Sequence, residues 1–172
     1  MKKVGILLGS DSDLPVVERA FGVLRELEIP FEAHIYSAHR TPLEAAEFTK
    51  TARAAGFGVL IAAAGMAAHL AGAVAANTTL PVIGSPCKSS VLDGMDALLA
   101  TVQMPSGVPV ATVAIGGAAN AALLAAEILA VSDDALAARL DARREADRQK
   151  VLEKDAALSA SLNQTPNAQS AF

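Results

Sequence analysis

Residues 3–13 read KVGILLGSDSD, an apolar run that stops at Gly9 and passes into a polar turn. A short, continuous apolar run is typical of a β-strand that is buried on both faces of a parallel sheet. The turn consists of residue types that cap helices, and a proline follows where the first helical turn would begin. The segment therefore predicts a strand, a turn and a helix, in that order.

The same order recurs along the rest of the chain. Apolar runs predict four strands, at residues 3–8, 57–63, 80–84 and 108–115. Alternation of Phe31, Ala33 and Ile35 with polar residues predicts a further strand, near an edge of the sheet, at residues 31–37. Apolar residues at helical spacing predict helices at residues 11–27, 41–55, 67–76, 91–102, 119–131 and 133–153. Five alternations of strand and helix predict an α/β fold with a five-stranded parallel sheet, helices on both faces and right-handed crossovers.

The domain organisation follows from the same pattern. Residues 1–154 are expected to form a single α/β domain that includes the C-terminal helix. Residues 155–172 are polar and lack periodicity, so a flexible tail is predicted there. Hydrophobic residues make up 52% of the chain, which is enough for a substantial core.

Charge and cysteine content restrict the function classes. The net charge is −4 and the first 130 residues contain no basic cluster, so neither nucleic acid nor an anionic membrane is expected as a partner. Cys87 is the single cysteine, which excludes an internal disulfide and fits a reducing, cytoplasmic location. Residues 54–76 lack charged side chains, but their alanines, glycines and His69 favour a buried strand, turn and helix over a membrane span.

Polar side chains are concentrated where the predicted strands end. The segments that follow the five strands are GSDSD (9–13), SAHRTP (37–42), AGMAAH (64–69), SPCKSS (85–90) and GGAAN (116–120). In a parallel sheet these carboxyl ends meet at one edge, which is where ligands bind. The turns at the opposite edge have fewer ionisable side chains, so we expect the functional site at the edge where the strands end, which we call the rim.

The rim residues suggest nucleotide chemistry. Free N–H groups at the start of the helix after Gly9 can hold an anion, and the carboxylates of Asp11 and Asp13 can accept sugar hydroxyls, although both residues could serve only as caps. Arg40 offers a planar fork of donors that fits phosphate, and His39 beside it can carry a proton near neutral pH. The alternative for this pair is a solvated surface loop.

Two further rim residues have plain structural interpretations. From its position alone, His69 is expected to be a hydrogen-bonded structural residue. Cys87 is expected to pack in the core, because no base is positioned to activate it. The histidines and the cysteine are too widely spaced for a recognisable metal set. Glycine motifs of dinucleotide and Walker-type sites are absent from the sequence.

Four segments together resemble one enzyme family. GSDSD, SAHRTP, AAHL (67–70) and VQMPSGVPVATVAIGGAANAALLAA (102–126) are similar, in order and spacing, to 5-(carboxyamino)imidazole ribonucleotide mutases of bacterial purine synthesis. The resemblance extends from about residue 3 to about residue 129. It implies a flavodoxin-like three-layer α/β/α sandwich, a nucleotide substrate as partner, no metal or organic cofactor, and a homo-octamer.

The resemblance also implies roles for individual residues. His39 matches the general acid/base of the family, and Arg40 matches the residue that binds phosphate. The other substrate-binding positions that it implies are Ser10, Ser12, Asp13, Ser37, Gly65, Ala67, His69 and Leu70, with Asp13 facing the ribose. In the implied reaction the substrate releases CO2 into a pocket that excludes water, and carbon 4 of the imidazole captures it while His39 removes the ring proton.

One loop departs from the family pattern. The segment after the third strand usually reads nearer AGAGGAAHLPG, whereas this chain has Ala63, Met66 and Ala71 in place of two glycines and a proline. Because glycine permits backbone conformations that other residues resist, these replacements are expected to affect the shape of the loop.

Two other functions remain open. A related branch of the family carboxylates aminoimidazole ribonucleotide with free CO2, and it usually has lysine where this chain has Arg40. A flavodoxin-like signalling or binding module is the alternative outside enzymes. Phosphorelay receivers need an aspartate after the third strand, where this chain has Ala64 and Gly65.

Overall fold

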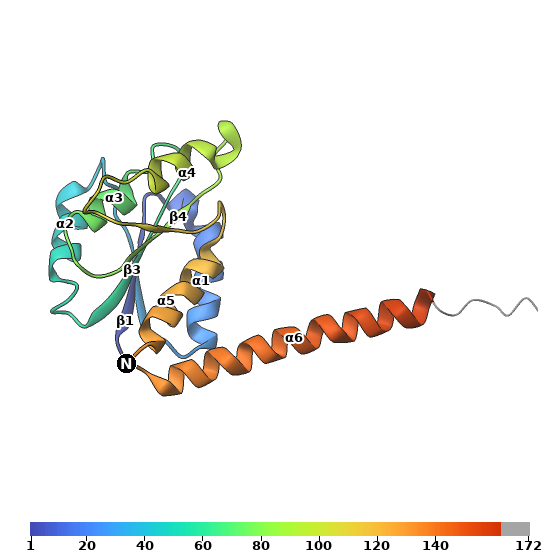
Figure 1. The fold of residues 1–172 in the computed structure, drawn as a ribbon. Coiled ribbons are helices and arrows are strands. Elements are labelled where there is room, and N and C mark those ends of the chain that lie inside the picture. The colour runs from blue at the N-terminus through green and yellow to red at the C-terminus, as the bar shows by residue number, and fades with distance from the viewer. Residues whose placement is uncertain (163–172) are drawn as a thin grey trace, which may run out of the picture.

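The computed structural model describes residues 1–162 and shows a five-stranded parallel sheet between two helical layers (Figure 1). The strands are β1 (Lys3–Leu8), β2 (Phe31–Ile35), β3 (Phe57–Ala64), β4 (Val82–Pro86) and β5 (Ala111–Thr112). The helices are α1 (Leu14–Glu26), α2 (Pro42–Thr51), α3 (Leu70–Ala75), α4 (Met95–Val102), α5 (Ala118–Ala130) and α6 (Asp134–Leu162), with 3-10 turns η1 (Asp11–Asp13) and η2 (Leu92–Gly94).

The strand order, β2-β1-β3-β4-β5, is that of the flavodoxin-like fold and confirms the predicted fold class. The chain runs from β1 outward to β2, then crosses back to β3 on the other side of β1. This reversal lies between β1 and β3, and in open α/β sheets a crevice forms at such a point. β2 is an edge strand, as its alternating sequence predicts.

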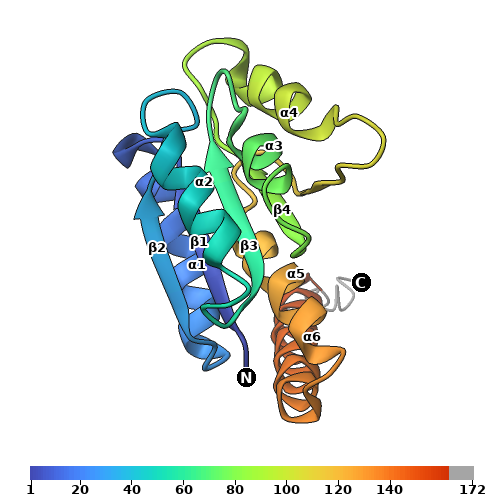
Figure 2. The same cartoon turned by 90° about the vertical axis from the view of Figure 1, so that its left-hand side faces the viewer.

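Each face of the sheet is covered by its own apolar cluster. α1 and α5 pack on one face, and α2 and α3 on the other, as Figure 2 shows from the side of α2. Side chains of β1 alternate between the two clusters, with Ile6 on the α1 side and Leu7 on the α2 side, both fully buried. Complete burial of such a side chain contributes about 1.5–3 kcal/mol, so β1 holds both layers together.

The fifth strand is much shorter than predicted. Residues 108–115 were expected to be a strand, but only Ala111 and Thr112 pair with β4. Pro109 has no N–H to donate to the ladder, and beyond the strand Gly117 donates to the Ala114 carbonyl in a turn. The apolar run therefore continues along the sheet edge as irregular chain.

Two predicted helices begin later than the sequence pattern indicates. The helix expected from residue 67 starts at Leu70, because Ala68 and His69 donate to the carbonyls of Met66 and Ala67 in a tight turn. The helix expected from residue 91 is interrupted at η2, where Leu92 and Asp93 have positive φ angles of 56° and 52°. α4 begins only after this break.

The remaining boundary differences are small except at the C-terminus. α6 extends to Leu162, well beyond the predicted end at residue 153, and so includes part of the segment predicted to be a flexible tail. The rest of that segment, residues 163–172, lies outside the described residues. β2 and α2 end earlier than predicted, and β4 is displaced toward the C-terminus by two residues, after Pro81.

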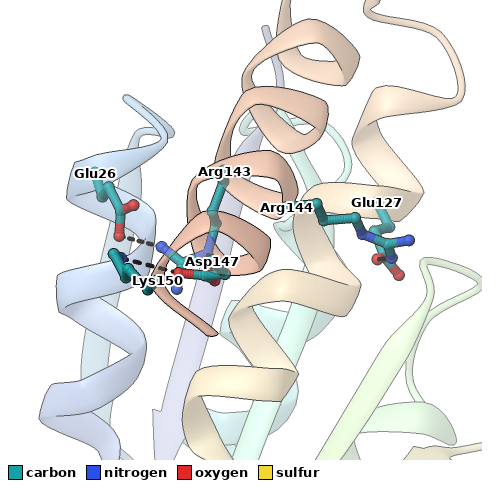
Figure 3. Close-up of polar contacts among 6 residues, drawn as sticks. All are labelled: Glu26, Glu127, Arg143, Arg144, Asp147 and Lys150. Atoms are coloured by element: carbon teal, nitrogen blue, oxygen red, sulfur yellow. Dashed lines mark hydrogen bonds and ion pairs between the residues drawn. The ribbon is translucent and has the colours of Figure 1, made fainter. Parts of the chain in front are cut away.

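α6 leaves the α/β body as a long, largely exposed helix (Figure 1). Leu136 and Leu140 anchor its first turns in the core. Ion pairs then connect it to two helices: Arg143 pairs with Glu26 of α1, and Arg144 pairs with Glu127 of α5 at 2.6 Å (Figure 3). Across residues 1–162, no helix is both long and apolar enough to cross a membrane. The apolar run at 54–76 folds as β3, a turn and α3.

Candidate functional site

A cavity of about 710 Å³ lies at the carboxyl edge of the sheet, where the rim site was expected. Four of the five strand-end loops line it. The lining residues are Gly9, Ser10, Ser12, Asp13, Ser37, Ala38, His39, Arg40, Ala64, Gly65, Met66, Ala67, Leu70, Lys88, Ser89 and Ser90. The structure thus brings together nine of the ten predicted site residues in the lining, and His69 contacts one of them directly.

The GSDSD turn is built by a capping box. The Ser10 hydroxyl accepts from the N–H of Ser12 at 3.3 Å, and the Asp13 carboxylate accepts from the N–H of Ser10 at 3.1 Å. Ser10 is therefore the cap of η1, rather than Asp11, Ser12 or Asp13 as the sequence suggested. Capping and ligand binding are not exclusive here, because Ser10, Ser12 and Asp13 also line the cavity.

The turn after β2 is organised by Ser37. Its hydroxyl accepts from the N–H groups of His39 and Arg40, at 3.3 and 3.2 Å. Its own N–H donates to the Thr41 hydroxyl at 2.8 Å, so Thr41 braces this turn instead of capping α2 with its side chain. Arg40 then reaches across to the turn after β1, where Nη2 donates to the Gly9 carbonyl at 3.3 Å.

The two histidines of the rim meet at the cavity. Nε2 of His39 and Nδ1 of His69 lie 2.8 Å apart, and the rings meet edge to face at a centroid distance of 5.0 Å. At that distance one ring nitrogen carries the hydrogen and the other accepts it. His39 is therefore hydrogen-bonded rather than merely solvated, and His69 has both a structural contact and a position beside the cavity. The third histidine, His34, lies in β2 and stacks on Tyr36, the residue that follows this strand.

The loop between β3 and α3 contains the departure from the family pattern. Met66 has a positive φ of 48°, a left-handed conformation that favours glycine. The hydrogen bonds of Ala68 and His69 to this segment hold the turn in place. The methionine thus adopts a backbone conformation suited to the family's glycine, and its side chain is more than half exposed at the cavity.

Asp13 is the buried carboxylate of the cavity lining, and Cys87 lies beside it in the core. Asp13 is only 8% exposed, and burial raises the pKa of its carboxyl, while the Ser10 N–H and the Cys87 thiol partly offset that rise. Burial raises the pKa of Cys87 to about 12, and the Asp13 carboxylate adds to the increase. Cys87 is 1% exposed, which confirms the prediction that it packs in the core.

The loop after β4 contributes more than sequence reasoning expected. Lys88, Ser89 and Ser90 line the cavity, although none was singled out as a binding residue. The available signal was their position on the rim directly after a strand. Asn120, which was expected in the segment after the fifth strand, lies in the first turn of α5 and lines a second cavity between α5 and α6.

Comparisons with known proteins agree on one family. A family model described as AIR carboxylase matches residues 3–150. A protein of Bacillus subtilis named N5-carboxyaminoimidazole ribonucleotide mutase is 56% identical over 152 residues, covering 87% of this chain and 94% of its own. A protein of Pyrococcus abyssi with the same name is 54% identical, covering 84% of this chain and 83% of its own. The crystal structure of Treponema denticola PurE superimposes with a TM-score of 0.83 at 32% identity, covering 90% and 97% of the two chains.

The buried thiol generates a prediction about reactivity. At pH 8 the thiolate of Cys87 should be about a thousandfold scarcer in the folded protein than in the unfolded chain, because its pKa of about 12 lies far above the ordinary value near 8.5. Reaction with a chromogenic disulfide should therefore be at least that much slower than in guanidinium.

A Ser159→Cys variant provides the comparison, since residue 159 is exposed on α6. Its added thiol should react at the rate of a free cysteine while Cys87 remains unmodified. Equal rates for both thiols in the native variant would contradict the buried, neutral state of Cys87.

Proposed function

The chain belongs to the AIR carboxylase family, and we propose that the rim cavity is its active site, with His39 as the proton carrier. The activity is that of a mutase: N5-carboxyaminoimidazole ribonucleotide is converted to 4-carboxy-5-aminoimidazole ribonucleotide in purine biosynthesis. The observation that supports the assignment of the site is the convergence of His39, Asp13 and Arg40 on one cavity, with His69 in contact with His39. A cytoplasmic location is part of the proposal, supported by the single cysteine.

The nucleotide is held between the first two strand-end loops. The Arg40 guanidinium binds the phosphate, because its planar fork matches phosphate oxygens and its present acceptor is only a carbonyl. Ser12 and Ser37 add hydroxyl donors, and the N–H groups of the turn after Gly9 supplement them. The Asp13 carboxylate accepts from the ribose hydroxyls, while Ser10 fixes its orientation through the capping box.

The imidazole lies against His39 and the loop of residues 65–70. When the carbamate C–N bond breaks, His39 donates a proton to the departing nitrogen and CO2 is released. Carbon 4 then attacks CO2, and the same imidazole of His39 removes the ring proton, so one proton is exchanged between carbon and nitrogen with no net change. His69 holds the orientation and tautomer of His39 through the 2.8 Å contact.

Confinement explains why CO2 is recaptured. The loop that contains Gly65, Ala67 and Leu70 presents backbone and small or apolar side chains to the cavity, which gives water few partners there. A CO2 molecule held beside carbon 4 reacts at a high effective concentration, whereas free CO2 would have to be captured from solution. No external carboxylate donor is then required.

Isotope labelling separates the mutase from a carboxylase that uses free CO2. The protein should convert the carboxyamino nucleotide to the carbon-carboxylated product without added bicarbonate. In the presence of ¹³C-bicarbonate, early product should contain little label, as mass spectrometry would show. Product that depends on bicarbonate and carries its label would assign the chain to the carboxylase branch instead.

Substitution of His39 tests the proton carrier. His39→Asn should bind the nucleotide with an affinity close to that of the wild type but reduce kcat by at least about a hundredfold, because general acid/base catalysis is lost. His69→Asn should reduce kcat by a smaller factor, since it only positions His39. Steady-state rates and calorimetric affinities measure both effects.

His34→Asn is the matched control, because His34 belongs to an aromatic cluster on β2 rather than to the cavity. Its kcat should remain within about threefold of the wild type. A rate close to wild type in His39→Asn would remove His39 from the mechanism.

A homo-octamer is the proposed assembly. α5 is apolar along most of its length, but it is largely covered within the chain by α1, α6 and the sheet. The support lies instead on α4, where large apolar side chains are exposed at helical spacing and just before the helix: Leu92, Met95, Leu99 and Val102. A continuous exposed apolar stripe of this kind is typical of an interaction surface.

Light scattering tests the assembly. The wild type should have a mass several times that of one chain, eightfold for an octamer, and Leu99→Asp should lower it because a carboxylate would be buried in the interface. Val131→Asp is the control, since Val131 is exposed outside the stripe. A monomeric wild type would contradict the proposal.

A further inference from the structure

We propose that Lys88 is a second substrate-binding cation, which exchanges its partner Asp93 for an anionic oxygen of the nucleotide. This inference rests on the proposed function, because the nucleotide carries both a phosphate and a carboxylate. Among the described residues that line the cavity, Arg40 and Lys88 are the two permanent cations. Arg40 alone would leave one of the two anionic groups without a charged partner.

The position of Lys88 complements that of Arg40. Arg40 follows β2 and Lys88 follows β4, with β1 and β3 between them in the sheet. At ordinary strand spacing the two loops are separated by about 14 Å. The two cations therefore border the cavity from opposite sides, which suits a ligand with an anionic group at each end.

The present partner of Lys88 can be exchanged. Nζ of Lys88 lies 3.0 Å from the Asp93 carboxylate, and the two side chains are 68% and 85% exposed. An ion pair this exposed is screened by water and holds its partners weakly. A phosphate or carboxylate oxygen of a nucleotide bound in the cavity would form a charge-assisted contact with the ammonium group in place of Asp93.

The backbone keeps Lys88 at the rim while its side chain can turn. Gly94, at a φ of 92°, packs against this segment so closely that a Cβ would lie 3.2 Å from the Cα of Lys88. The Ser89 hydroxyl lies within hydrogen-bond distance of the Val91 carbonyl and the Asp96 carboxylate, which ties the loop to the start of α4. The loop therefore fixes the position of the Lys88 backbone, and Asp93 is the partner that restrains its ammonium group.

Steady-state kinetics of the full-length protein provide the first test. Lys88→Met should raise KM about tenfold with kcat within about twofold of the wild type, because a charge-assisted contact to bound substrate is lost. Lys88→Arg should restore KM to within about threefold. The difference between Lys88→Met and wild type should shrink at high salt, which a purely structural role would not produce.

Two further variants sharpen the test. Asp93→Asn keeps a residue type that tolerates positive φ and removes the competing carboxylate, so KM should fall by about two- to fivefold. Lys50→Met removes a positive charge from the exposed face of α2 and should leave KM unchanged. A Lys88→Met KM within twofold of wild type, or an unchanged or higher KM in Asp93→Asn, would overturn the proposal.

Calorimetric titration identifies the anionic group. If Lys88 binds the carboxylate, Lys88→Met weakens binding of the carboxylated product but not of aminoimidazole ribonucleotide, which lacks that group. If it binds the phosphate, both nucleotides bind more weakly. Unchanged affinities for both would reject Lys88 as a ligand. A wild type without mutase activity would instead refute the proposed function, and the titrations would still report on Lys88.

Discussion

The site depends on the level ends of three neighbouring strands. In the ladders on either side of β1, Leu8 is paired with Ile35 of β2 and with Ala63 of β3. The Gly9 N–H then donates to the Ala63 carbonyl, and Tyr36 donates to the carbonyl of Leu8. Because the three strands end at the same level of the sheet, the loops that follow them border one cavity although they are far apart in sequence. A slip of one residue in either ladder would turn the side chains of that strand to the other face and separate the loops.

The sequence predicts this arrangement well where burial alone determines structure, and less well where local geometry intervenes. Strands β1 and β3 are buried on both faces and give uninterrupted apolar runs, so the rim and most of its residues could be located from them. The predicted length of the fifth strand was wrong because Pro109 interrupts a run that is otherwise as apolar as the buried strands. The break at η2 was not predicted, because neither Leu92 nor Asp93 is a residue type that strongly indicates a positive φ. Lys88 was not singled out because a lone lysine in a loop forms no motif, and its place in the cavity depends on which loops lie beside it.

Burial and chemical function act in opposite directions at Asp13. Asp13 accepts a backbone N–H that favours its charged form, yet burial raises its pKa, so the carboxylate is held at some cost in a partly desolvated position. A desolvated carboxylate is a stronger acceptor for ribose hydroxyls than one surrounded by water. Cys87 beside it remains a neutral thiol and fills space without adding a second charge. The same packing that makes the cysteine inert therefore makes the aspartate a better ligand.

The loop after β3 shows how a site can tolerate an unfavourable residue. A left-handed backbone costs a residue with a Cβ roughly 1–2 kcal/mol relative to glycine, and Met66 bears this cost at φ 48°. The cost is small compared with what fixes the loop: β3 on one side, α3 on the other, and the hydrogen bonds that make the turn before His69. Relaxing Met66 would shift His69 and break its 2.8 Å contact with His39. The strain therefore persists because the surrounding structure determines the turn, and the glycine of the family pattern is a favourable choice rather than a requirement.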